Sequence, residues 1–272
     1  MKTDARPRGA LRLTPCTYGL SKLLFRGPRR PVDGRYIAFL GGSETFGKYI
    51  PKPFPDLIET AIGEICVNLG CQSAGPDVFL NDTAIQSICH DAAAAVVQVS
   101  SAANLSNGYY KVHPRRNDRF IAPTEKLVTL FPEVDYAEIS FTGHLIARLR
   151  ATDEDRFAIV RDHLQLTWVR RIKTLVGQVT GPVLLLWLAS RAPQDESEGV
   201  NPSSHPTFVT REMLEAVRPF VADIIEVIAE RGDTTGMHFA PLETLAAADM
   251  LGVAAHVESA KALRGPLIHS LT

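Results

Sequence analysis

A serine in a small-residue turn is the side chain of this sequence best suited to covalent chemistry. The segment Gly41–Thr45 reads Gly-Gly-Ser-Glu-Thr and directly follows an apolar run, residues 36–40, that is typical of a buried strand. Such a turn places a hydroxyl at the carboxyl edge of a sheet, where open α/β folds bind ligands. The position therefore predicts that Ser43 is a nucleophile. It is not the G-x-S-x-G elbow of the α/β-hydrolases, because Thr45 stands where the second Gly is required.

Three more polar turns rich in small residues follow predicted strands further along the chain. Residues 68–76 follow the second strand, residues 100–107 follow the third, and residues 233–238 come after the fifth. The carboxyl ends of parallel strands lie at one edge of a sheet. We therefore expect all of these turns to converge on Ser43.

The order of these turns resembles that of the SGNH (GDSL-like) hydrolase superfamily. Gly41–Thr45 is similar to the serine block of that superfamily, and Gly70 with Gly75 is similar to its glycine block. Asn104 is the best match to the asparagine of the third block, with Asn107 as the alternative. The resemblance implies that these residues surround one catalytic site.

The histidine block of the resemblance is Gly236–His238, late in the chain. The likeness extends over residues 36–110 and 183–260, and the whole chain also resembles an uncharacterised alphaproteobacterial protein family of this length. The sequence departs from the superfamily at Thr235, where the family has an Asp that orients the catalytic His. Asp233 is the alternative carboxylate.

The mechanism that the resemblance implies is acyl transfer through an acyl-enzyme. His238 would take the proton of Ser43, because a serine hydroxyl is a weak nucleophile without a base. The backbone N–H of Ser43, that of Gly70 or Gly75, and the Asn104 amide would hold the oxyanion, and one such donor is typically worth about 3–4 kcal/mol. The expectation is an SGNH-like serine esterase or acyl-ester hydrolase. The alternatives are an acyl or sulfuryl transferase on the same site, and a non-catalytic ligand-binding protein on a degenerate hydrolase scaffold, which the missing Asp favours.

The densest basic stretch contains Arg115, Arg116 and Arg119 and follows the turn after the third strand. Guanidinium groups bind carboxylate, sulfate or phosphate through paired hydrogen bonds. We expect these arginines to bind a small-molecule or carbohydrate-linked anionic substrate, with Asn107 and His205 as further contacts. The alternative is a solvated, salt-bridged loop.

Composition excludes several other classes of protein. The net charge of −1 gives no reason to expect nucleic acid or a membrane surface as a partner, and the longest apolar run, residues 182–189, is too short to span a bilayer. The histidines show no paired ligand spacing and the four cysteines form no C-x-x-C pair, so we expect no metal, no cofactor and no disulfide framework. We expect a cytoplasmic protein, and the composition allows a homo-oligomer as well as a monomer.

Strands and helices alternate along most of the chain. This alternation predicts an α/β fold, a three-layer α/β/α sandwich with a five-stranded, mostly parallel sheet in flavodoxin-like or SGNH-like order. The strands are expected at residues 36–40, 65–69, 94–99, 182–188 and 223–228, and the main helices at 54–62, 82–91, 157–179, 211–217 and 241–263.

The expected organisation is one α/β domain with two additions. Residues 1–34 form an N-terminal arm with a short helix over residues 18–24, and residues 35–272 form a single SGNH-like domain. An insertion of mixed structure is expected at about residues 105–155, and residues 191–205 form a lid-like loop.

Overall fold

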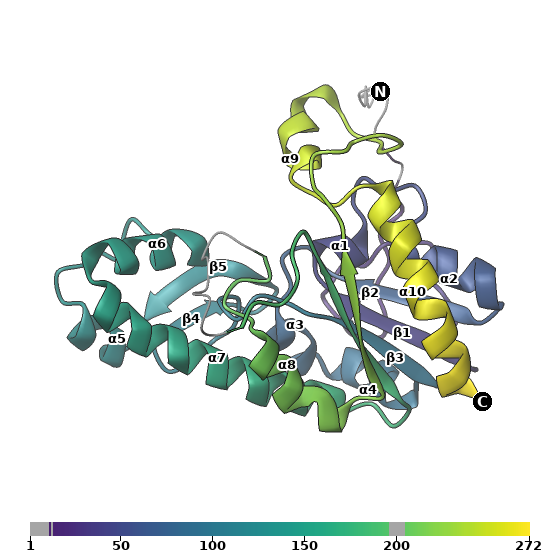
Figure 1. Ribbon diagram of the computed structural model, residues 1–272, viewed down its shortest axis with the longest axis horizontal. Coiled ribbons are helices and arrows are strands. Elements are labelled where there is room, and N and C mark those ends of the chain that lie inside the picture. The colour runs from purple at the N-terminus through teal and green to yellow at the C-terminus, as the bar shows by residue number, and fades with distance from the viewer. Residues whose placement is uncertain (1–10, 12, 196–204) are drawn as a thin grey trace.

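A parallel sheet of five strands forms the centre of the computed structural model, which describes residues 11, 13–195 and 205–272 (Figure 1). The strands lie in the order β2-β1-β3-β6-β7, and each adjacent pair is parallel. This is the flavodoxin-like order, so the predicted fold class is confirmed. The strands are β1 (Tyr36–Gly41), β2 (Ile65–Gly70), β3 (Ala94–Gln98), β6 (Val183–Ala189) and β7 (Asp223–Ile228).

Helices cover both faces of this sheet. Side chains alternate along a strand, so Ile37 and Phe39 of β1 pack with α2 and α10, whereas Ala38 and Leu40 pack on the other face with α3, α4 and α7. Burial on two faces explains why the strands read as continuous apolar runs. The helices are α2 (Phe54–Ile62), α3 (Pro76–Leu80), α4 (Thr83–Asp91), α7 (Glu154–Val176), α8 (Arg211–Val217) and α10 (Val253–Leu271).

Polar caps fix where several helices begin. Asp153 accepts a hydrogen bond from the backbone N–H of Arg156, so α7 begins at Glu154. The predicted start was residue 157, three residues later. Thr210 caps α8 in the same way, and that helix has the predicted bounds.

Among the helices of the described ranges, none is long and apolar enough to cross a membrane.

The predicted terminal helix over residues 241–263 is instead broken into three pieces. A 3-10 turn, η3 (Pro241–Glu243), leads into α9 (Thr244–Ala248), and α10 begins only after Gly252. The segment between β7 and α10 thus leaves the sheet and projects beyond it, carrying α9 (Figure 1).

The segment between β3 and α7 contains a second, two-stranded sheet. It consists of β4 (Tyr110–His113) and β5 (Arg116–Pro123), which are antiparallel, followed by α5 (Glu125–Leu130) and α6 (Thr142–Thr152). Its apolar side chains, among them Tyr110, belong to the same core cluster as β3. The segment therefore packs as a continuous extension of the main core.

The predicted helix at residues 18–24 is wrong, because this part of the chain is extended and turned. Leu20 and Leu24 are exposed, whereas Leu23 and Phe25 are buried. Burial that alternates between neighbours is the pattern of extended backbone. Arg26, which follows this stretch, is buried and donates to the carbonyl oxygens of residues 47, 50 and 51.

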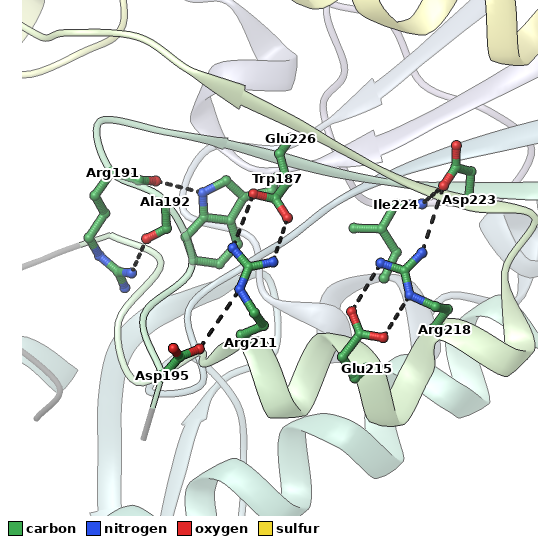
Figure 2. A network of polar contacts seen from close by, with 10 residues as sticks. All are labelled: Trp187, Arg191, Ala192, Asp195, Arg211, Glu215, Arg218, Asp223, Ile224 and Glu226. Carbon is green, nitrogen blue, oxygen red and sulfur yellow. Dashed lines mark hydrogen bonds and ion pairs between the residues drawn. The ribbon is translucent and has the colours of Figure 1, made fainter. Parts of the chain in front are cut away.

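Ion pairs tie α8 to the edge strand β7 (Figure 2). The Arg211 guanidinium donates to both carboxylate oxygens of Glu226, at 2.9 and 3.4 Å. At the end of β6, the Trp187 indole N–H donates to the carbonyl oxygen of Arg191 at 2.7 Å. These contacts hold the chain directly after β6 and at the start of α8. Residues 196–204 of the predicted lid lie outside the described residues.

Candidate functional site

A cavity of about 430 Å³ lies at the carboxyl ends of β1 and β3. Ser43, which follows β1, and Ser101, which follows β3, form part of its wall. The strand order reverses between β1 and β3, and such a switch point is where open α/β sheets bind ligands. The turns after β1, β2 and β3 converge here as predicted, but the turn at residues 233–238 does not line the cavity. The segment after β7 supplies Arg231 and Asp249 instead.

Gln98 on β3 fixes the turn that carries Ser43. Its Oε1 accepts hydrogen bonds from the Gly42 N–H at 3.1 Å, the Thr45 N–H at 3.2 Å and the Thr45 hydroxyl at 2.6 Å. Gly41 must be glycine for this approach, because a Cβ there would lie 2.1 Å from Thr45 Oγ1 and 2.6 Å from Gln98 Oε1. Ser43 begins the short helix α1 (Ser43–Phe46) directly after this turn.

The Ser43 hydroxyl is held by the backbone of the turn after β2. The Ser73 N–H donates to Ser43 Oγ at 3.2 Å. Ser73 has a φ of 56°, in the left-handed region that costs energy for a residue other than glycine. This conformation points a backbone donor at the hydroxyl from the neighbouring strand end.

Gly70 and Gly75, the expected oxyanion donors, already have other partners. The Gly70 N–H donates to Asn68 Oδ1 at 2.9 Å, and the Gly75 N–H donates to Asn117 Oδ1 at 3.0 Å. Gly75 serves close packing instead, because a Cβ there would lie 1.9 Å from the Asn104 carbonyl oxygen. The structure thus places Ser73, and neither glycine, as the backbone donor beside Ser43.

Asn104 and Asn107 have different roles. Asn104 lines the cavity, and its Oδ1 accepts a hydrogen bond from the Thr142 hydroxyl at 2.8 Å. This contact turns its side-chain NH₂ away from Thr142 and leaves that group as a donor. Asn107 Oδ1 accepts from the backbone N–H groups of Tyr109 and Tyr110, so Asn107 stabilises the turn before β4.

The structure does not bring His238 to Ser43. His238 is exposed, and its backbone N–H donates to the Tyr49 carbonyl at 2.9 Å. The cavity wall does not include it, and in the described part of the chain no hydrogen bond joins its ring to Ser43. Asp233 instead accepts the Thr235 N–H at 2.9 Å. The predicted pairing fails because the histidine lies on the segment that projects from the sheet.

His205 is the histidine of the cavity wall. Its Nδ1 lies 3.1 Å from Ser101 Oγ, which in turn accepts the Thr207 N–H at 2.9 Å. Arg191 donates to the carbonyl oxygen of Pro206 at 2.9 Å and so fixes the next residue of the loop. His205 was expected as a substrate contact, and the structure places it in the wall of the cavity that contains Ser43, although in the described part of the chain no hydrogen bond joins its ring to Ser43.

The cavity shifts the pKa of two of its ionisable groups. Desolvation lowers the pKa of His205, the positive charges of Arg231 and Arg191 lower it further, and Asp249 opposes the shift. Burial raises the pKa of Glu44 to about 7, against the opposing effects of Arg231 and the Leu251 N–H. The lowered pKa of His205 favours the neutral imidazole, which is the form that a general base requires.

The predicted arginine patch lies outside the cavity wall. Arg115 is exposed, Arg116 forms an ion pair with Asp118 at 3.0 Å, and the Arg119 guanidinium lies 5.6 Å from the centre of the Phe141 ring. The side chains are solvated or salt-bridged, as in the alternative interpretation, but Arg116 and Arg119 lie on β5 and not in a loop.

The interpretation of the sequence missed Ser73, Ser101, Glu44 and Arg231. The two serines lie within the polar turns after β2 and β3, and Glu44 directly follows Ser43. A search that treated every polar residue of each turn as a candidate would have found those three. Arg231 lies outside the polar turns, two positions before the turn at residues 233–238. Only this closeness in the sequence could have suggested it.

In the described ranges no group of three or more His, Cys, Asp or Glu residues is arranged to hold a metal ion. The side chains of the cavity wall supply hydroxyl, imidazole, amide, carboxyl and guanidinium groups.

The sheet order and the cavity at its switch point define a doubly wound α/β protein with a polar site at the carboxyl edge of the sheet. The chain belongs to the family described as "Domain of unknown function (DUF6473)", whose model matches residues 1–272. No curated protein matches the chain.

Proposed function

We propose that the protein is a serine esterase or acyl-ester hydrolase with Ser43 as its nucleophile and His205 as its base. One observation carries the proposal: Ser43, Ser73, Asn104 and His205 line a single cavity at the sheet's switch point. These residues supply a hydroxyl, a backbone N–H, an amide and a neutral imidazole, which are the groups that acyl transfer requires.

The first half of the reaction forms an acyl-enzyme. When His205 Nδ1–H donates to Ser101 Oγ, the lone pair of Nε2 is left to accept a proton. Ser43 Oγ attacks the ester carbonyl carbon while its proton moves to His205 Nε2. The bond from the carbonyl carbon to the alcohol oxygen then breaks, and the alcohol leaves with that proton.

The second half of the reaction releases the acid. Water attacks the acyl carbon and gives a proton to His205, which returns it to Ser43 Oγ as the serine–acyl bond breaks. An acceptor hydroxyl in place of water would give an acyl transferase with the same residues.

We propose that two donors stabilise the charge that develops on the carbonyl oxygen. One is the Ser73 N–H, which now donates to Ser43 Oγ at 3.2 Å and would turn to the carbonyl oxygen, and the other is the NH₂ of Asn104, whose Oδ1 accepts from Thr142. Removing one such donor typically lowers kcat by about 10²–10³-fold.

A second candidate function, non-catalytic ligand binding, is favoured by two contacts. Ser43 Oγ accepts a backbone N–H, and in the described part of the chain His205 pairs with Ser101 rather than with a carboxylate. An imidazole without a carboxylate partner is less well stabilised as the charged form. In this case the same donors would bind a carbonyl or carboxylate group without turnover.

Reaction with a fluorophosphonate probe, followed by peptide mapping of the adduct, tests the proposal. We expect the adduct on Ser43, complete loss of labelling in Ser43→Ala, and slower labelling in Ser101→Ala. An adduct on Ser101 would contradict the assigned nucleophile. A folded protein that forms no adduct but binds carbonyl ligands would support the second candidate.

A further inference from the structure

A second cavity, of about 560 Å³, adjoins the one that contains Ser43. The two cavities share Asn104, Asp118 and His205 in their walls. They are therefore two halves of one elongated site, with Ser43 in one half and helix α6 along the other.

The half along α6 is mainly apolar. Besides the shared residues, its wall contains the apolar residues Ala103, Phe141, Ile146 and Ala147, together with Gly143 and the hydroxyl-bearing Thr142 and Thr207. Among the described residues of this wall, the one further charged side chain is Arg150, and its Nε donates to both carboxylate oxygens of Glu154 at 3.1 and 3.0 Å. An arginine that is neutralised in this way does not require an anion in the cavity.

The apolar wall is incompletely covered by the protein itself. Phe141 is 45% exposed, and Ala147 is exposed on α6. Next to them, a Cβ built on Gly143 would meet no atom within 4 Å. A hydrocarbon group that enters the cavity would remove this apolar surface from water, which is favourable in proportion to the area covered.

We propose that this cavity binds the aliphatic chain of the acyl group, so that the substrates are esters of unbranched aliphatic carboxylic acids. Asn104 sets the orientation of the bound ester, because this residue lies in the walls of both halves. A carbonyl oxygen held by Asn104 and Ser73 places its carbon at Ser43, and the chain attached to that carbon enters the apolar half. The acyl chemistry rests on the proposed function, but binding of the chain does not.

Calorimetric titration with the n-alkyl carboxamides from butanamide to decanamide measures chain binding without catalysis. The carboxamide supplies the carbonyl, and the chain is the one variable. Each added methylene is expected to tighten Kd by about fourfold until the cavity is filled, because burying one methylene is worth about 0.8 kcal/mol. Affinity that does not change with chain length would overturn the proposal.

Two matched variants on α6 localise the effect. Ala147→Phe places a ring in the apolar half from an exposed position, so binding of decanamide should weaken at least tenfold while that of butanamide stays within twofold. Ala151→Phe makes the same change one turn further along α6, at an exposed residue that is not in the cavity wall, and should change neither. Equal effects of the two variants, or no effect of Ala147→Phe, would overturn the assignment.

Ester hydrolysis separates this inference from the proposed function. Chain-dependent amide binding that is sensitive to Ala147→Phe, in a protein that hydrolyses no p-nitrophenyl ester, supports the chain site and contradicts the esterase. Hydrolysis that depends on Ser43 but not on acyl length supports the esterase and contradicts the chain site.

Discussion

Replacing Gln98 with leucine tests whether one side chain of β3 holds the turn that carries Ser43. The change removes an acceptor of three hydrogen bonds, from the Gly42 N–H and from the N–H and hydroxyl of Thr45. A typical hydrogen bond contributes about 1 kcal/mol net, so the three together contribute about 3 kcal/mol. Water in the adjoining cavity can replace part of this, but Thr45 is fully buried and its hydroxyl loses its partner. We expect Gln98→Leu to lower the free energy of unfolding by about 2–3 kcal/mol.

Urea denaturation gives this free energy, and an unchanged m-value would show that the unfolded state is unaffected. Gln98→Glu keeps an oxygen acceptor and should cost less than about 1 kcal/mol. Gln178→Leu is the matched control, because the buried Oε1 of Gln178 has no hydrogen-bond partner in the described part of the chain, and we expect no loss of stability. The reasoning is refuted if Gln98→Leu changes stability by no more than Gln178→Leu does, or if Gln98→Glu is as harmful as Gln98→Leu.

Two further predictions concern the surroundings of the site. Because burial raises the pKa of Glu44 from 4.5 to about 7, the folded state favours the protonated carboxyl. Its stabilising effect is therefore present below pH 4.5 and is lost as the pH rises through about 7. In urea titrations between pH 4 and pH 8, the stability of Glu44→Gln should therefore rise by about 3 kcal/mol relative to that of the parent. A constant difference across that range would contradict the buried carboxyl. Arg26→Met removes donors to the carbonyl oxygens of Ile50 and Pro51, at 2.8 and 2.9 Å, and should lower the free energy of unfolding by about 3 kcal/mol, whereas exposed Arg115→Met should have almost no effect.

Much of the fold could be predicted because local patterns and global architecture agree. The apolar runs of β1, β2, β3, β6 and β7 are separated by helical patterns and end in polar turns, and this combination specifies a parallel sheet. The bounds of α2 and α8 also matched the prediction, because their ends carry clear signals such as the Thr210 cap. The prediction failed at residues 18–24, where burial alternates, and at residues 241–263, where the helical pattern is interrupted before Gly252.

The site was predictable only as a place, the carboxyl edge near Ser43. The identity of the histidine was not predictable, because His205 approaches the cavity through a contact with Ser101, more than one hundred positions earlier in the chain. A short motif around His238 carries no information on whether its segment folds toward the sheet or away from it. The same limit applies to Gly75, whose N–H is occupied by the distant Asn117.

In the proposed mechanism His205, and not His238, is the base that accepts the proton of Ser43. The most direct measurement is the rate of fluorophosphonate labelling at pH 7 in the parent, His205→Gln and His238→Gln, each shown to be folded by circular dichroism. A general base typically contributes about 10²–10⁴-fold, so His205→Gln should slow labelling by at least about a hundredfold while His238→Gln reacts at the parent rate. Slow labelling in His238→Gln together with the parent rate in His205→Gln would contradict the account.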